Sequence, residues 1–183
     1  MNNEYRSLLL TAGEKFRLVP YDVTFSESLF EAVDESRAEL MRRVAWCGAD
    51  YTMEHGRRWL QSRERYRFEG RAFDFAITDA TTGELVGGCG IENIERENRV
   101  GKLYYWVRNS RSREGAASAA AHAVASFGLH NLQLIRLEAL VAEENYAGQR
   151  VAEKIGASRE IRLHNRLILN GKVHHAYLFA LFP

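Results

Sequence analysis

The segment best suited to chemistry spans residues 108–118, where a predicted strand passes through a basic loop into a helix of very small residues. The first N–H groups of a helix have no partner within it and carry the positive end of the helix dipole, so they bind anions such as a pyrophosphate. Gly115 and the alanines after it leave the backbone open to phosphate oxygens. An alanine-rich helix also packs closely on a sheet, and loop arginines are often solvated, so a purely structural interpretation stays open. The loop's three positive charges come from Arg108, Arg111 and Arg113.

A second segment, residues 144–156, follows a predicted strand and opens a helix for which Asn145 is well placed as the N-cap. Together with residues 104–107, it resembles the GNAT N-acetyltransferase superfamily, and most of all its RimJ/RimL-like branch of ribosomal-protein N-terminal acetyltransferases. That branch carries, in this order, a tyrosine–tryptophan strand, a Q/R-x-x-G-x-G/A loop and an E-N-x-x-S-x-x-V-x-E-K-x-G stretch. Here these motifs are Tyr105–Trp106, Ser112-x-x-Gly115-x-Ala117, and Glu144–Asn145 through Gly156, and the likeness runs from Phe16 to Phe182.

The resemblance implies transfer of an acetyl group from acetyl-CoA to an amine, directly within a ternary complex. In the family, the strand expected over residues 100–107 offers backbone groups to the pantetheine arm, the loop over 113–118 wraps the pyrophosphate, and Asn145 hydrogen-bonds the pantetheine. The strands over 100–107 and 134–141 splay apart in this fold, where a main-chain N–H can donate to the thioester oxygen. The implied cofactor-binding residues are Tyr105, Trp106, Val107, Arg111, Arg113, Glu114, Gly115, Ala116, Ala117, Ser118, Asn145 and Arg150.

Three positions depart from the family pattern. Ser112 replaces the usual Gln or Arg, so one loop contact is either lost or taken over by Arg111 or Arg113. Gly148 stands where the branch has a serine and Ala152 where other members have a tyrosine, so neither usual proton donor for the departing thiolate is present. A thiol has a pKa of about 8.5, so it can leave as a thiolate without a donor. Tyr146 is the nearest replacement as a catalytic acid, although a tyrosine at a helix start also serves packing.

The attacking amine must be neutral, so a general base is expected. Glu92 is the candidate, because it follows the glycine-rich residues 87–91 near the end of a strand that flanks the cleft in related folds. A solvent-facing glutamate is the alternative. Gly87, Gly88 and Gly90 are expected to permit a bulge in this strand. Cys89 is expected to be a small buried residue rather than a nucleophile. His174 and His175 would face opposite sides of a strand, so they cannot share an ion, and no metal is expected.

Composition limits the class of protein. The chain has 183 residues, 46% hydrophobic and 27% charged, which is typical of a globular domain of ordinary size. Its 25 basic and 24 acidic side chains give a net charge of +1, so neither nucleic acid nor a membrane surface is an expected partner. Cys47 and Cys89 lie far apart without a CxxC motif, which favours a reducing cytoplasm. The apolar run at residues 8–10 is too short for a secretory signal.

Hydrophobic periodicity predicts the elements that position these residues. The order is βααβββαβαββ, an α/β single-domain GNAT fold with a mixed, mainly antiparallel sheet and helices on both faces. One domain is expected over residues 1–183, with its core over about 14–182. Strands are expected at 14–19, 73–77, 84–94, 100–107, 134–141, 158–163 and 172–182, and helices at 26–44, 53–69, 115–129 and 145–155.

The branch favours a protein N-terminal α-amine, of the ribosomal-protein type, as the amine acceptor. Relatives that acetylate polyamines, amino acids or aminoglycosides keep a small amine as the first alternative. A non-catalytic acyl-CoA-binding regulatory domain is the second, because both usual proton donors are missing. Trp46, Trp59 and Tyr66 are predicted on the first two helices, where the family shapes its acceptor pocket. Homodimers are common among relatives, so a homodimer is also an expectation.

Overall fold

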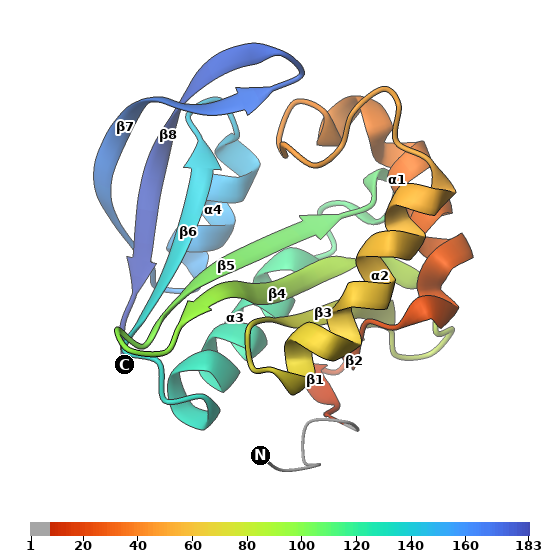
Figure 1. Cartoon of the computed structure of the whole chain (residues 1–183), viewed down its shortest axis with the longest axis horizontal. Helices are drawn as coiled ribbons and strands as arrows, with labels where there is room; N and C mark the ends of the chain where they lie inside the picture. Colours follow the sequence, from red (N-terminus) through yellow and green to blue (C-terminus); the bar gives the residue numbers. More distant parts are fainter. Residues whose placement is uncertain (1–7) are drawn as a thin grey trace.

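The computed structural model describes residues 8–183, and its centre is one eight-stranded sheet in the order β1-β2-β3-β4-β5-β6-β8-β7 (Figure 1). All neighbouring strands are antiparallel except β5 and β6, which are parallel. The strands are β1 (Leu10–Ala12), β2 (Phe16–Pro20), β3 (Phe73–Asp79), β4 (Leu85–Glu95), β5 (Val100–Val107), β6 (Arg136–Ala142), β7 (Ser158–Leu169) and β8 (Lys172–Leu181).

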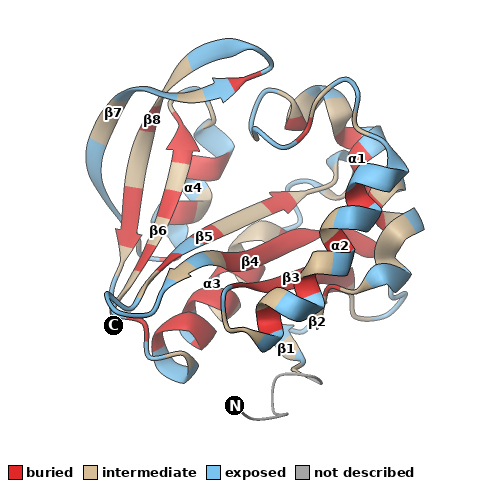
Figure 2. Ribbon diagram, viewed as in Figure 1, coloured by how far each residue is buried: buried red, intermediate tan, exposed pale blue. Residues whose placement is uncertain are grey.

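Helices cover both faces of this sheet. On one face lie α1 (Ser26–Leu40) and α2 (Met53–Phe68), and on the other α3 (Ala116–Ser126) and α4 (Tyr146–Lys154) (Figure 1). Apolar side chains of α3 pack with β3 and β4 into the largest core cluster, and a second cluster lies under α1 and α2. Buried residues follow the central strands and the inward faces of the helices (Figure 2). The sheet therefore has a separate apolar layer on each side.

Local sequence signals explain where several elements begin and end. Thr52 caps α2 through a reciprocal pair of hydrogen bonds with His55, and Asn145 accepts the Gly148 N–H at the start of α4. Asn170 and Gly171, both with positive φ, turn β7 into β8. These signals match the expected start of α4 and the expected hairpin.

The predicted fold class is confirmed, and the predicted element order is confirmed from Phe16 onward. One strand was missed, since β1 pairs with β2 ahead of it and buries Ala12, so the core begins before residue 14. The first helix ends at Leu40 rather than residue 44, which leaves Trp46 in the loop before α2 and not on a helix. No helix within residues 8–183 is long and apolar enough to cross a membrane.

Candidate active site

The two parallel strands at the centre of the sheet separate after a short ladder. β5 and β6 pair only from Val100 with Arg136 to Lys102 with Glu138 and then diverge, while β6 stays paired with β8 on its other edge (Figure 1). The stretch of β5 from residue 103 to 107 therefore has no strand partner on its β6 side. This stretch contains Tyr105, Trp106 and Val107. Unpaired strand edges present N–H and C=O groups that an extended ligand can bind.

Tyr105 and α4 meet across this opening. The Tyr105 hydroxyl donates to the Gly148 carbonyl at 2.8 Å, and the Gly148 N–H donates to Oδ1 of Asn145 at 3.0 Å. A Cβ at position 148 would lie 2.7 Å from Nδ2 of Asn145 and 3.0 Å from Cγ1 of Val141, so a side chain there requires both neighbours to move. Position 148, where the RimJ/RimL-like branch has a serine, is therefore packed closely around a glycine in this chain. Nδ2 of Asn145 makes no hydrogen bond within residues 8–183 and can donate to a ligand.

The first turn of α3 faces the same opening. Gly115 is its N-cap with φ +86°, a conformation that favours glycine, and no side chain caps the helix. The N–H groups of Ala116, Ala117 and Ser118 thus lack partners within the helix. A Cβ on Gly115 would meet nothing within 4 Å, and Gly115 and Ser118 both line an open groove. The geometry fits an anion at the start of α3.

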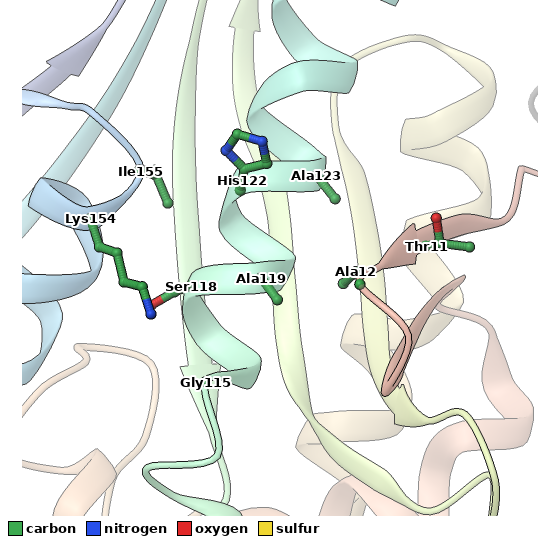
Figure 3. A pocket seen from close by; sticks show the side chains of 10 residues that line it. Thr11, Ala12, Gly115, Ser118, Ala119, His122, Ala123, Lys154 and Ile155 are labelled. Atoms are coloured by element: carbon green, nitrogen blue, oxygen red, sulfur yellow. The ribbon is translucent and has the colours of Figure 1, made fainter.

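A groove of about 350 Å³ extends along the outer face of α3 from this point (Figure 3). The start of α3 forms one end, the turn after β1 forms one wall, and the end of α4 forms the other. The Lys154 side chain extends toward Ser118, and His122 lies one turn further along α3 (Figure 3). The groove residues are Thr11, Ala12, Gly13, Gly115, Ser118, Ala119, His122, Ala123, Lys154 and Ile155. Lys154 and His122 were not among the site residues expected from the sequence.

Two arginines of the basic loop are held by carboxylates. Arg111 pairs with Asp79 at 2.8 Å, Glu84 at 2.6 Å and Glu114 at 2.9 Å, and its guanidinium lowers the pKa of the Asp79 carboxyl. Arg108 pairs with Glu84 at 3.1 Å and with Glu35. These contacts fix the loop against β3, β4 and α1. The guanidinium of Arg111 and the carboxylate of Glu114 are therefore engaged with each other rather than presented to a phosphate.

The remaining basic side chains around the opening form no ion pair within the described residues. Arg113, Arg150 and Lys154 form no ion pair within residues 8–183, and Arg113 and Arg150 are exposed. Arg113 also has a positive φ of 68°, so the loop turns sharply just before Gly115. Free positive charge thus lies beside the open N–H groups of α3, which is the arrangement that a pyrophosphate requires.

On the opposite face of the sheet, beneath α1 and α2, two glycines make room for aromatic rings. A Cβ on Gly88 would lie 2.5 Å from Nε1 of Trp106, and one on Gly90 would lie 2.8 Å from Cε1 of Tyr104. The expectation that the glycines permit a bulge fits Gly87, beside which the β3–β4 register shifts, but it is wrong for Gly88 and Gly90, which pair regularly with both neighbouring strands. They are glycines because side chains from β5 lie across them.

Glu92 follows on this same face. In the β4–β5 ladder it lies opposite Lys102, the last residue of β5 that pairs with β6. Burial, reinforced by the negative charge of Asp74, raises the pKa of the Glu92 carboxyl, while Lys102 and Arg63 act against this. A carboxylate with a raised pKa is a better proton acceptor, which suits a general base. Its assignment as the base stays a prediction.

Other candidates have less support from their surroundings. Tyr146, the first residue of α4, is 70% exposed, and its hydroxyl makes no hydrogen bond within residues 8–183. The Trp106 side chain is buried and packs against Trp46, so it would serve a cofactor only through its backbone. Cys47 and Cys89 are both buried, and burial raises the pKa of both thiols. Within residues 8–183, no group of three or more potential ligands could hold a metal ion.

A strand splay beside an open, glycine-started helix can hold an extended ligand that carries a phosphate group. The acetyltransferase (GNAT) domain family matches residues 16–158, and the chain belongs to this family. It is therefore an acetyl-CoA-dependent N-acetyltransferase of the GNAT type.

Individual relatives agree with this family. The chain is 27% identical to the uncharacterized N-acetyltransferase p20 of Bacillus licheniformis, over 70% of this chain and 72% of that protein. Its fold matches RimL, a ribosomal L7/L12 α-N-protein acetyltransferase in complex with coenzyme A. That match has a TM-score of 0.89 and 20% identity, and covers 96% and 98% of the two chains. The microcin C7 self-immunity acetyltransferase MccE, in complex with acetyl-CoA and AMP, matches with a TM-score of 0.85 and 15% identity over 94% of each chain.

Proposed function

We propose that this chain acetylates the N-terminal α-amine of a protein, of the ribosomal-protein type, by direct transfer from acetyl-CoA. The observation that carries the proposal is the junction of the open β5 edge with the uncapped first turn of α3, in a fold that matches RimL over nearly the whole chain.

In this proposal the cofactor lies along three groups of residues. The pantetheine arm pairs with the β5 edge at Tyr105–Val107 and with Nδ2 of Asn145, and the pyrophosphate accepts from the first N–H groups of α3. Arg113 and Arg150 add positive charge there, since neither is ion-paired within the described chain. The adenosine end follows the groove beside α3, where Lys154 would meet a phosphate. Arg111 and Glu114 contribute by holding the loop in shape.

The transfer itself requires a base and a leaving group. The neutral amine nitrogen attacks the thioester carbon, the C–S bond breaks, CoA leaves as a thiolate, and Glu92 takes the amine proton. A main-chain N–H of β5 donates to the carbonyl oxygen as negative charge develops on it. Since both cysteines of the chain are buried thiols with raised pKa, transfer through an acetyl-cysteine is disfavoured. Tyr146 stays the candidate that would protonate the thiolate.

The experiment is a comparison of three acceptors at equal concentration, with release of the CoA thiol as the readout. The acceptors are a peptide with the free N-terminus of ribosomal protein L7/L12, the same peptide with a blocked N-terminus, and spermidine. We expect turnover of the free peptide and none of the blocked one. Preference for spermidine would instead favour a small-amine acetyltransferase. Binding of acetyl-CoA without turnover of any acceptor would favour a regulatory acyl-CoA-binding domain.

A further inference from the structure

One lysine lies at the fork where β5 and β6 separate (Figure 1). Lys102 is the last residue of β5 that pairs with β6, and its partner there is Glu138. On its other side, in the β4–β5 ladder, it lies opposite Glu92. The Lys102 side chain is exposed, so solvent reaches this point of the sheet. The chain thus places one of its own primary amines at the closed end of the opening.

The Lys102 side chain rises on the face of the sheet that carries α1 and α2. Tyr104, two residues further along β5, points to this face, because its hydroxyl donates to Asp74 at 2.8 Å. Asp74 in turn lies 3.3 Å from a guanidinium nitrogen of Arg63 on α2. Alternate residues of a strand share a face, so Lys102 points the same way. Since α3 and α4 cover the opposite face, Lys102 stands on the side of the opening that these two helices leave uncovered.

No carboxylate holds the Lys102 ammonium group. Within residues 8–183 this group forms no hydrogen bond and no ion pair. Glu138, its partner in the β5–β6 ladder, pairs instead with Arg136 at 2.6 Å. Glu92 makes no ion pair within the described residues either, although the charge of Lys102 lowers the pKa of its carboxyl. The lysine is therefore free to turn its amine into the opening.

The proposed position of the cofactor brings the thioester toward the same fork. The pyrophosphate lies at the start of α3, beyond the end of β5, so the pantetheine arm runs back along the open edge from Val107 toward Leu103. An edge of five residues spans about 17 Å. An extended lysine side chain reaches about 6 Å from its Cα, and the next Cα along the chain is about 3.8 Å away. A thioester held against the main chain near Leu103 is thus within reach of the Lys102 amine.

We propose that Lys102 is a modification site, acetylated by this chain itself from its own bound acetyl-CoA. The ammonium group first loses a proton to solvent, and the neutral nitrogen then attacks the thioester carbon. The new C–N bond forms, the C–S bond breaks, CoA leaves as a thiolate, and Glu92 on the neighbouring strand takes the second proton. Because the amine is part of the chain, no separate acceptor has to bind. The inference rests on the proposed cofactor position and not on the identity of the acceptor.

Acetylation of Lys102 would also change the proposed general base. The charged groups that act on Glu92 are Asp74 on β3, Lys102 on β5 and Arg63 on α2. Burial and Asp74 raise the pKa of the Glu92 carboxyl, whereas Lys102 and Arg63 lower it. Loss of the Lys102 charge therefore raises this pKa further, so a larger fraction of Glu92 is protonated at a given pH. The acidic limb of kcat/KM for an added acceptor should then move to higher pH.

The test is peptide mass mapping of the full chain after incubation with acetyl-CoA and no added acceptor. The chain has four lysines, and Lys15, Lys154 and Lys172 are exposed like Lys102, so they are internal controls. Lys102 should be acetylated at least about tenfold faster than Lys172 at the start of β8, because its amine is held beside the thioester. The rate for each chain should not depend on chain concentration. Excess CoA should slow acetylation of Lys102 but not of Lys172.

Two substitutions test the effect on Glu92 with the L7/L12 N-terminal peptide as acceptor. Lys102→Gln lacks the charge, as acetyl-lysine does, and should move the acidic limb of kcat/KM to higher pH. Lys102→Arg keeps the charge but has no amine to acetylate, and should leave this limb in place. The same limb in both variants would overturn the influence of Lys102 on the base.

Failure of this inference is distinguishable from failure of the proposed function. Equal acetylation of Lys102 and Lys172, in a chain that acetylates the L7/L12 peptide, overturns self-acetylation and leaves the proposed function standing. A Lys102 rate that rises with chain concentration shows transfer between two copies and overturns transfer within one chain. Rapid acetylation of Lys102 without acetylation of the peptide supports the inference and overturns the assignment of the acceptor.

Discussion

Replacement of Gly115 by tryptophan separates cofactor binding from folding. Gly115 has φ +86°, and its Cβ position meets nothing within 4 Å, so a new side chain would project into the open space before α3. The cost to folding is then confined to the left-handed backbone, about 1–2 kcal/mol. For a chain of this length, that corresponds to a fall in Tm of about 2–8 °C. The variant should therefore fold.

The cost to binding should be much larger, because the tryptophan ring would occupy the place of the pyrophosphate. A hydrogen bond to a charged group contributes about 1.5–3 kcal/mol, so the loss of two weakens binding by roughly 10²- to 10⁴-fold. Isothermal titration with acetyl-CoA measures this directly. Gly171→Trp is the matched control, since Gly171 also has a positive φ of 73° and nothing within 4 Å of its Cβ position, but lies in the β7–β8 turn.

The two variants should thus lose similar stability and differ in affinity. Equal acetyl-CoA affinity in Gly115→Trp and Gly171→Trp would refute the placement of the pyrophosphate at α3. Loss of binding in both would show that the effect comes from backbone strain rather than from the site.

Three further predictions concern single residues. Glu92→Gln should lower kcat at neutral pH about 100-fold. In the unaltered enzyme, kcat/KM should fall with acidification at a pH above the ordinary glutamate range, because the pKa of Glu92 is raised. A kcat within twofold of the unaltered enzyme would show that Glu92 is not the general base. Gly90→Ala should destabilise the fold by about 1–3 kcal/mol in thermal unfolding, because its Cβ would lie 2.7 Å from the Phe73 carbonyl oxygen; a Tm equal to that of the unaltered chain would contradict this packing. Lys154→Ala should weaken CoA binding about tenfold but leave dephospho-CoA binding unchanged, and an equal loss for both ligands would remove Lys154 from the phosphate.

Much of the fold was predictable because the signals are local. The alternation of β3 and the tight turns around it mark the meander, and Asn170–Gly171 marks the last hairpin. β1 was missed because three residues are too few to show a period. β7 was expected to end at residue 163 but runs to Leu169, since its pairing with β8 is irregular around residues 163–167 and its sequence is rich in charge. Such irregular pairing depends on the partner strand and leaves no period in the sequence.

The residues of the candidate site likewise fall into two groups, those with a local sequence signal and those brought together only by the fold. Gly115 and Asn145 were identifiable because a left-handed N-cap and a side-chain cap are encoded by single residue types. The ion pairs of Arg111 were not, because Asp79 and Glu84 reach it only through the fold. The groove between α3 and α4 and the position of Lys102 at the β5–β6 fork likewise depend on contacts distant in sequence, which periodicity does not report.

Mass spectrometry of an unblocked peptide tests the central claim most directly. The chain would be mixed with acetyl-CoA and the L7/L12 N-terminal peptide, and the peptide mass and the free CoA thiol would be followed together. We predict that one acetyl group appears on the α-amine for each CoA released, and that Gly115→Trp abolishes both signals. An unmodified peptide, in a sample shown by titration to bind acetyl-CoA, would contradict the claim that this site transfers the acetyl group to a protein N-terminus.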